Sequence, residues 1–272
     1  MIHAIEWRWI PHLFSIEIRR VLSYRVDFWL NLFCSLFAKV GLAYFVWKEI
    51  FHVRGVDVIA GYDFHAMMMY YVVSAFIYEV NSVDLGFFSR DIYDGTLTRY
   101  LIFPLPFFGY KYVTCLSRAA VLFVQVGVAL ALFYFTIGIP EGLHISASSI
   151  VLGTAATLLA GYLMFVVLAC LDLTAFWADK VWSLGVIMQL TTQFLGGVYL
   201  PIQTFPEWAQ SLVTTLPFFY IIAFPVRTLF GELSSQSLMY GFILAALWAM
   251  VFTLLARVIW RRGMLRYSGV GQ

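Results

Sequence analysis

The sequence predicts an all-α integral membrane protein with six transmembrane helices. Hydrophobic residues make up 62% of the 272 residues and charged residues 12%, with a mean hydropathy of +0.86. Long apolar runs alternate with short segments that hold most of the basic residues. This composition is typical of membrane proteins, and it leaves no room for a soluble catalytic domain of ordinary size.

Six apolar runs are long enough, or nearly so, to cross a bilayer. A bilayer core about 30 Å thick needs about 20 residues of helix. The runs cover residues 28–47, 66–83, 119–139, 145–171, 181–200 and 238–256. We therefore expect one six-span transmembrane domain over residues 27–272, preceded by a separate segment, residues 1–26.

Basic residues lie mainly on one side of these runs. With six spans, one side receives Arg8, Arg19, Arg20, Arg25, Arg90, Arg99, Lys111, Lys180, Arg257, Arg261, Arg262 and Arg266. The other side receives only Lys48, Arg54 and Arg227. Because cytoplasmic loops are enriched in Lys and Arg, both termini are expected in the cytoplasm. A seventh span over 208–226 would export the C-terminal arginines, and Pro217 would interrupt it.

The segment 1–26 is expected to be an amphipathic helix in the cytoplasmic interface of the lipid bilayer. Apolar residues recur at helical spacing over residues 10–26, and Glu17 is one of the polar positions between them. Trp7 and Trp9 are typical interfacial anchors. A solvated tail is the alternative.

Two of the predicted spans carry a polar face. Residues four apart share a helix face, and in the first span these are Asp27, Asn31, Ser35 and Lys39. The corresponding residues of the fifth span are Gly185, Gln189, Thr192 and Gly196, with Gln193 beside them. Such residues allow close packing and hydrogen bonds between helices, and a polar face turns away from lipid. Each stripe is therefore predicted to be either a seam, between helices or between two subunits, or a wall of a water-filled path.

Lys39 and Glu79 are charges inside the first and second runs. Counted from the cytoplasmic ends of their spans, Lys39 lies about 18 Å deep and Glu79 about 7 Å. This difference argues against a direct ion pair. Lys111 or Arg118, reaching along the membrane by snorkelling, is the expected partner of Glu79.

A short helix is expected on the cytoplasmic side between the second and third spans. Ser89 is in position to cap this helix, and Gly95 to end it in the left-handed conformation. Its apolar side chains are expected to point outward as knobs, and they are Ile92, Tyr93 and Leu97. Charged side chains surround them, namely Arg90, Asp91 and Asp94.

Proline breaks the chain between the fifth and sixth runs. Thr204 and Glu207 have capping-box spacing, with Pro206 in the first turn. This spacing predicts a short helix that Pro217 ends, followed by a second helix over 218–230. Broken backbone is tolerated at membrane depth only where protein or a water-filled cavity surrounds it. We expect a re-entrant hairpin, and a surface hairpin without a gating role is the alternative.

Two strings give the chain a resemblance to a known family. They are Asp94-Gly95-Thr96-Leu97, and the tract from Phe194-Leu-Gly-Gly through Pro201 and Phe205-Pro206-Glu207-Trp208 to Leu216-Pro217. With the six-span layout and the basic tail, they make the chain resemble type-2 ABC transporter permeases over essentially its whole length. The second string is the more specific of the two.

The resemblance implies roles for both segments. In that family the cytoplasmic helix docks on a separate ATPase, and the hairpin caps the outer mouth. The implied ATPase-coupling residues are Arg90, Asp91, Ile92, Tyr93, Asp94, Gly95, Thr96 and Leu97. The implied re-entrant gate consists of Pro201, Pro206, Glu207, Trp208 and Pro217.

The resemblance also implies partners and a location. The partners are two copies of an ABC ATPase, which bind the ATP and Mg, and a second permease subunit, identical or paralogous. The function would be ATP-driven export across the plasma membrane of a bacterium or archaeon. The transported compound cannot be read from the sequence.

Other chemistry finds little support in the sequence. The chain lacks a Gly-x-x-x-x-Gly-Lys-Ser/Thr loop, so it is expected to hydrolyse no ATP and to hold no cofactor. Its five histidines form no His-Glu-x-x-His pair, so no metal site is expected, and nucleic acid is not an expected partner. Asp172 and Asp179, near Lys180, are interpreted as an ordinary interfacial charge cluster. The alternative function is an ion-gradient-driven transporter with Glu79 and Lys39 as charge carriers, although the chain shows no inverted repeat.

Overall fold

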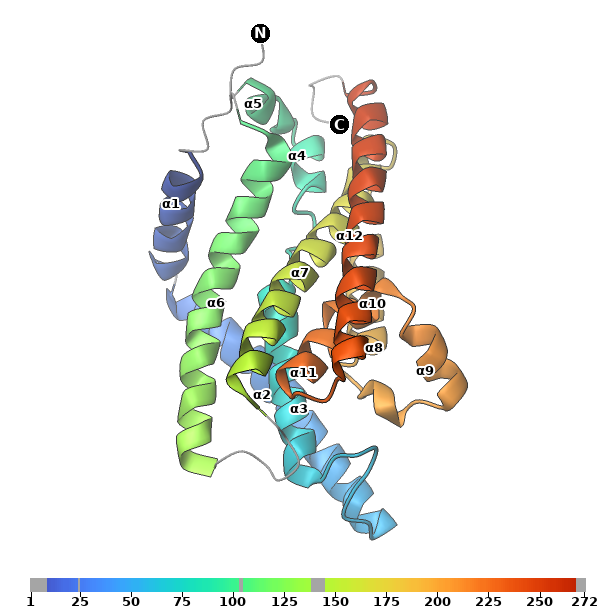
Figure 1. Cartoon of the computed structure of the whole chain (residues 1–272). Helices are drawn as coiled ribbons and strands as arrows, with labels where there is room; N and C mark the ends of the chain where they lie inside the picture. The colour runs from blue at the N-terminus through green and yellow to red at the C-terminus, as the bar shows by residue number, and fades with distance from the viewer. Residues whose placement is uncertain (1–8, 24, 103–104, 138–144, 268–272) are drawn as a thin grey trace.

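The computed structural model describes residues 9–23, 25–102, 105–137 and 145–267, and in these ranges the fold is helical without a strand (Figure 1). The longer helices are α2 (Arg25–Arg54), α3 (Phe64–Asn81), α6 (Phe107–Ile137), α7 (Ala147–Asp172), α8 (Trp182–Leu195) and α12 (Ser235–Met264). The shorter ones are α1 (Trp9–Ser23), α4 (Ser89–Tyr93), α5 (Leu97–Ile102), α9 (Glu207–Val213), α10 (Pro217–Ile221) and α11 (Ala223–Leu229), with 3-10 turns η1 (Leu173–Phe176) and η2 (Ile202–Thr204).

A helix lies at each of the six predicted spans. Within the described residues, three segments are long and apolar enough to cross a membrane: Phe107–Gln125, Ala147–Phe176 and Ser235–Met264. Helix α8 has 14 residues, about 21 Å at 1.5 Å per residue, which is shorter than the bilayer core. The all-α membrane class thus agrees with the structure, and the count of six spans stays a prediction.

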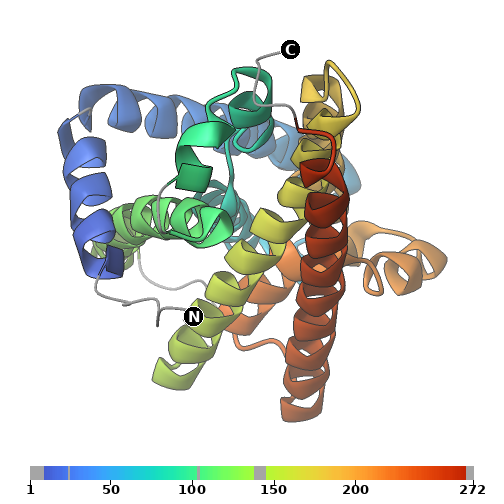
Figure 2. The same cartoon turned by 90° about the horizontal axis from the view of Figure 1, so that it is seen from above.

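Helix α7 forms the centre of the bundle. It packs against α12 and α11, and also against α3, α8 and α10 (Figure 1, Figure 2). Most residues in its second half are buried, from Leu163 to Cys170 without a break. A helix that is apolar all round in this way is suited to the core of a larger assembly of helices.

Helix α12 packs along α7, and every residue that it buries is small. The buried residues of α12 are Gly241, Ala245, Ala249, Ala256 and Gly263. A Cβ at Gly241 would overlap Phe224, and a Cβ at Gly263 would overlap Phe176. Small residues at these spacings let helices approach closely where lipid offers no hydrophobic driving force.

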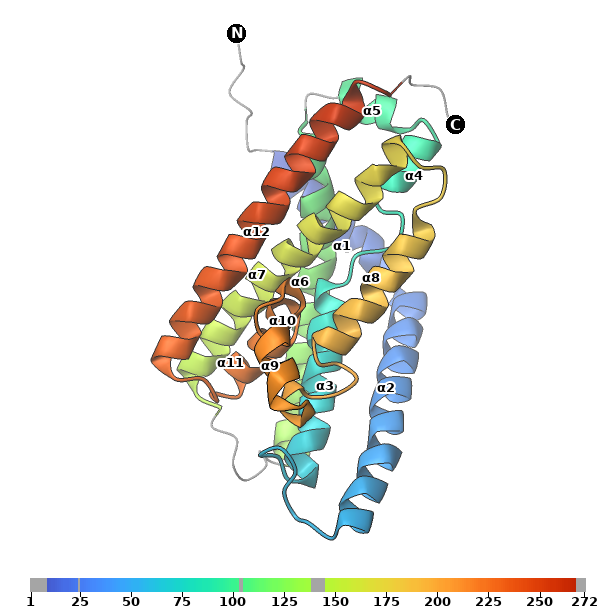
Figure 3. The same ribbon diagram turned by 90° about the vertical axis from the view of Figure 1, so that its right-hand side faces the viewer.

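The two ends of the bundle differ. Helices α4 and α5 lie at the same end as the C-terminal end of α12, which we call the α4–α5 end (Figure 1, Figure 3). The loop between α2 and α3 and the turn between α11 and α12 lie at the opposite end (Figure 3).

Helix α1 agrees with the predicted helix in the N-terminal segment, but its polar residues are placed differently. It packs against α6, and Glu17, expected on the polar face, is 4% exposed and paired with Arg20 at 3.4 Å. Exposed apolar residues such as Ile16 lie on the other side of the helix. Trp7 and residue 24 lie outside the described residues, and the boundary between residues 26 and 27 stays a prediction.

Candidate functional site

The segment between α3 and α6 forms the first candidate site. As expected, a short helix is followed by Gly95 in the left-handed conformation, with φ of +68°. The predicted cap is wrong, because Ser89 is the first residue of α4 and is itself buried. Phe88 occupies the cap position and offers no side-chain hydrogen bond. The first N–H groups of α4 therefore require an acceptor from elsewhere.

Asp172, the last residue of α7, supplies this acceptor. The Phe88 N–H donates to Asp172 Oδ2 at 2.9 Å, and the Ser89 N–H also points to this carboxylate. Asp172 is only 2% exposed, whereas Asp179 is exposed. The interpretation of both aspartates as one interfacial cluster is therefore wrong for Asp172. Its partner is 84 residues away along the chain, so sequence spacing carried no signal for it.

Lys111, near the start of α6, holds α4 from the side. Its Nζ donates to Phe87 O at 2.7 Å and forms an ion pair with the Asp91 carboxylate. Lys111 is 7% exposed and also lies over the Phe87 ring, 4.3 Å from its centroid. Arg118 pairs with Asp84 at 2.8 Å. The expected pairing of Glu79 with Lys111 or Arg118 is therefore wrong.

Tyr93 and Tyr267 attach the end of α4 and the turn after it. The Tyr93 hydroxyl donates to Ala178 O at 2.9 Å and accepts from the Val181 N–H at 3.2 Å. Partial burial raises the pKa of Tyr93 above its ordinary value, so the hydroxyl stays neutral and fills both roles. The Tyr267 hydroxyl donates to Gly95 O at 3.0 Å. The segment 82–102 is thus joined to four other parts of the chain, and we call it the clasp.

The clasp turns Ile92 and Leu97 inward, whereas Leu101 and Ile102 at its end are exposed. Ile92 is 5% exposed and Leu97 is fully buried, so the expectation that they are outward knobs is wrong. They are buried because the adjacent Phe88 packs on Phe107 and Phe165, which draws α4 onto the bundle. Tyr93, Asp91, Gly95 and Thr96 are half-buried. The exposed residues of the clasp include Arg90, Asp94 and Arg99.

The polar stripe of the first span is a seam between α2 and α3. Lys39 Nζ lies 3.0 Å from Glu79 Oε1, and the Ser35 hydroxyl donates to the same oxygen at 2.7 Å. Lys39 and Glu79 were expected to lie apart on the premise that both helices begin at the same depth in the membrane. Helix α2 is instead shifted along α3 and extends beyond it at the opposite end (Figure 3). The side chains of Asp27 and Asn31 lie outside the described residues.

The polar stripe of the fifth span also packs within the chain. Gly185, Thr192, Gln193 and Gly196 are buried, and Gln189 is half-buried. A Cβ at Gly185 would lie 2.7 Å from Leu85, and one at Gly196 would lie 2.7 Å from Ile222. These residues therefore pack within this chain, and a role of the stripe in a substrate path or a dimer seam stays a prediction. The exposed face of α8 is apolar instead, with Trp182, Leu184, Ile187, Leu190 and Phe194.

The broken segment before α12 forms the second candidate site, and its local structure differs from the prediction. Pro206 takes the cap position of α9 in extended conformation, before the first turn. Thr204 donates its hydroxyl to Pro201 O at 2.7 Å, so the predicted capping box is wrong. Helix α9 already ends at Val213, so Pro217 does not end it as predicted. Pro217 instead begins α10, because its fixed φ suits a first helical residue.

The inner half of this segment is buried in the bundle. Ile221, Ile222, Phe224 and Val226 are each at most 1% exposed, and α10 and α11 pack on α7, α3 and α8. Protein thus surrounds the broken backbone of α10 and α11, which do not lie on the surface, and the re-entrant gate stays a prediction. Helix α9 projects sideways from the bundle, with Glu207 and Trp208 exposed (Figure 1).

Two tyrosines of α3 anchor the turn that follows α8. The Tyr70 hydroxyl donates to Gly197 O at 2.9 Å and the Tyr71 hydroxyl to Tyr199 O at 2.8 Å. Gly197 has φ of +90°, and its carbonyl has no strand or helix to accept from. Sequence reasoning missed both tyrosines, although paired tyrosines in an apolar run indicate hydroxyls that need partners.

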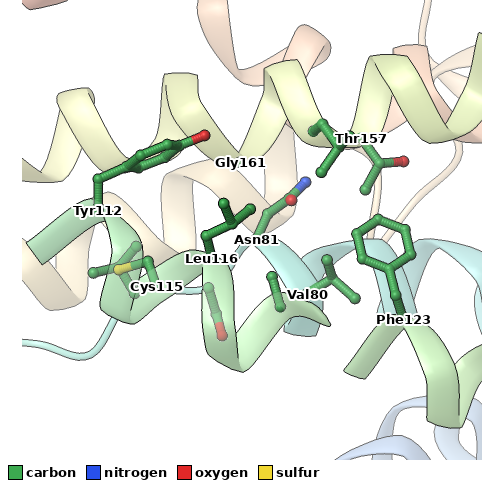
Figure 4. A pocket seen from close by; sticks show the side chains of 12 residues that line it. Val80, Asn81, Tyr112, Cys115, Leu116, Phe123, Thr157 and Gly161 are labelled. Atoms are coloured by element: carbon green, nitrogen blue, oxygen red, sulfur yellow. The ribbon is translucent and has the colours of Figure 1, made fainter. Parts of the chain in front are cut away.

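A small cavity lies between the end of α3, α6 and α7 (Figure 4). Its volume is about 30 Å³, and Asn81, Tyr112, Cys115 and Thr157 are among its lining residues. The Asn81 amide donates to Ile221 O at 3.2 Å. Within the described residues there is no group of three or more His, Cys, Asp or Glu that could hold a metal ion. The cavity has room for about one water molecule.

The apolar helices, the buried broken hairpin and the clasp define a class of protein. It is a helical membrane protein in which a short segment outside the bundle is joined to several of the long helices. The sequence model of the ABC-2 family transporter proteins matches residues 37–271, so the chain belongs to this family. The resemblance to type-2 ABC permeases is confirmed, and the chain is a transmembrane permease of an ABC transporter. Among curated proteins, none matches the chain.

Proposed function

We propose that this chain is the membrane subunit of an ATP-driven exporter. Two such subunits, identical or paralogous, would enclose the substrate path. Two copies of a separate ABC ATPase, which bind the ATP and Mg, would drive them. The chain would span the plasma membrane of a bacterium or archaeon six times, with both termini in the cytoplasm.

The observation that carries this proposal is the clasp. A short segment that is displaced by a partner moves the transmembrane helices only if it is attached to them. Here Asp172, Lys111 and Tyr93 join the clasp to α7, α6 and the start of α8. Exposed Arg90, Asp94 and Arg99 are the charged groups that an ATPase surface would meet.

Charge supports the proposed orientation. Arg257, Arg261, Arg262 and Arg266 are exposed at the α4–α5 end, and Lys and Arg are enriched in cytoplasmic loops. Labelling with a membrane-impermeant maleimide tests this. A cysteine at Asp57 should react in intact cells, and one at Asp94 only after permeabilisation, in a background with the three native cysteines replaced.

The partner is tested by purifying the chain from its native membrane in mild detergent. An ABC ATPase should be present in the complex, and the complex should hydrolyse ATP with sensitivity to vanadate. The chain alone, reconstituted in vesicles, should transport nothing. Sustained uphill flux by the chain without a second protein contradicts the proposal.

The alternative, an ion-gradient-driven transporter, depends on Glu79 as a charge carrier. Its carboxylate is held by Lys39 and Ser35, which fits a structural seam. Glu79→Gln separates the two functions. In this variant an ATP-driven exporter should keep its ATP-dependent flux, whereas an ion-driven transporter should lose its flux. The unchanged protein, if ion-driven, should remain active when ATP is depleted under a maintained gradient.

A further inference from the structure

The clasp and the broken hairpin lie far apart in the bundle, yet both contact α7. Asp172 at the last residue of α7 accepts from the backbone of α4. Toward its other end, α7 packs on α11, where a Cβ at Gly153 would overlap Leu229. The helix has 26 residues, about 39 Å at 1.5 Å per residue. One rigid element thus connects the two candidate sites.

The clasp has other attachments, but among the described helices α7 packs most extensively on α11. Lys111 belongs to α6, which packs on α1 and α3. Tyr93 contacts the loop before α8, whose helix packs on α10. Tyr267, which holds Gly95, follows α12, and α12 packs on α7, η1 and α10. Helix α3 does contact α11, but it joins α4 through non-helical residues 82–88, with Gly86 at φ of +77°.

We propose that α7 transmits the displacement of the clasp to the hairpin, with Asp172 as the positioning residue that joins α4 to α7. This inference rests on the proposed function, because it assigns the path by which an ATPase docked on the clasp moves the hairpin. The carboxylate suits this role because hydrogen bonds to a charged acceptor are stronger than neutral ones. Close packing at Gly153 keeps the far end of α7 in register with α11.

The test reads the hairpin without a transported substrate. A cysteine at Ser211, exposed on α9, is introduced into a chain without native cysteines. Its maleimide labelling rate is measured in the complex with the copurified ATPase, with and without ATP and vanadate. With Asp172 present, nucleotide should change the rate severalfold. In Asp172→Ala that change should be lost, while ATPase copurification and ATP hydrolysis persist.

Two further variants keep the test decisive. Asp179→Ala removes an exposed carboxylate seven residues away and should leave the nucleotide response intact. Asp172→Asn keeps one acceptor oxygen and should respond between the Ala variant and the parent. Should Asp172→Ala fail to fold, Gly153→Ala should lose the response from the other end of α7 with the clasp intact.

The outcomes are distinct. A full response in Asp172→Ala shows that other helices carry the displacement and overturns this inference while the proposed function stands. Full responses in both Asp172→Asn and Gly153→Ala do the same. Absence of any ATPase from the parent complex overturns the proposed function and this inference with it.

Discussion

Lys39 Nζ and Glu79 Oε1 lie 3.0 Å apart at the contact between α2 and α3. The lysine is the 15th of 30 residues in α2, and the glutamate is two residues from the end of α3. Lys39 also lies over the Tyr78 ring, 4.5 Å from its centroid. Both charged side chains are about one-fifth exposed, so the pair is partly shielded from solvent. If either side chain of the pair were removed, the remaining charge would lie among mainly apolar side chains at the contact between α2 and α3.

We therefore expect Lys39→Met to destabilise the protein by about 2 kcal/mol, less than the 3–5 typical of a fully buried pair. The reason is that, among the described side chains, Ser35 is the one partner left to the Glu79 carboxylate. The double variant Lys39→Met with Glu79→Leu should recover most of the loss, because no charge stays unpaired. Thermal unfolding in detergent, followed by intrinsic fluorescence, measures both. A double variant as unstable as the single one contradicts the argument.

Charge reversal on the clasp should weaken ATPase binding without unfolding the chain. Arg90 and Arg99 are exposed, and we expect Arg90→Glu and Arg99→Glu each to lower affinity roughly fivefold to tenfold at low salt. Binding by the purified chain is measured by surface-immobilised titration. Arg54→Glu, equally exposed at the opposite end, is the matched control and should bind normally. Equal affinity in all three variants excludes docking on this surface.

Ile92→Asp tests whether the side chain of Ile92 is buried in the folded clasp. Since Ile92 is 5% exposed, a buried carboxylate should destabilise the clasp. Any loss of ATPase binding in this variant should therefore come with a lower unfolding temperature. Lost binding with an unchanged unfolding temperature contradicts the inward position of Ile92.

Tyr70→Phe should loosen the turn after α8. Tyr70 is fully buried and donates to Gly197 O, so removal of its hydroxyl leaves a buried carbonyl unpaired at a cost of about 1–2 kcal/mol. Thermal unfolding provides the measurement. Tyr240→Phe, on an exposed residue of α12, is the control and should be neutral. Indistinguishable stabilities would remove the anchoring role.

Gly263→Ala should destabilise the packing of α12 on η1. The added Cβ would overlap the Phe176 ring, and overpacking of this kind costs about 1–3 kcal/mol. Gly41→Ala on α2 meets nothing within 4 Å and should be neutral, or stabilising by up to about 1 kcal/mol through helix propensity. A stable Gly263→Ala protein shows that Phe176 can move aside.

Local features were predictable where they depend on neighbouring residues. The left-handed Gly95, the short helix before it and the break at Pro217 follow from backbone sterics and needed no long-range information. The small-residue face of α12 was equally readable from its spacing. The length of the apolar run, on which the predicted sixth span rests, does not reveal this face.

Errors arose where a residue's partner lies on another helix. Ser89 has the chemistry of a cap, but α4 receives its acceptor from Asp172 on α7. Ile92 and Leu97 have the pattern of exposed apolar residues in the sequence. They are buried because Phe88 packs on Phe165 and holds the clasp against the bundle. The stripe with Gly185 and Gly196 predicts close packing, and its partners are residues of this chain, Leu85 of the clasp and Ile222.

By itself, the sequence determined the membrane class, the all-helical elements and the family, because hydropathy, helix breakers and motif strings are properties of contiguous residues. Only the tertiary structure decided the relative levels of the helices, and thus the pairing of Lys39 with Glu79 and the burial of Asp172. The physical reason is that helix length fixes the rise within one element, whereas the shift of one helix along another is set by side-chain packing between them.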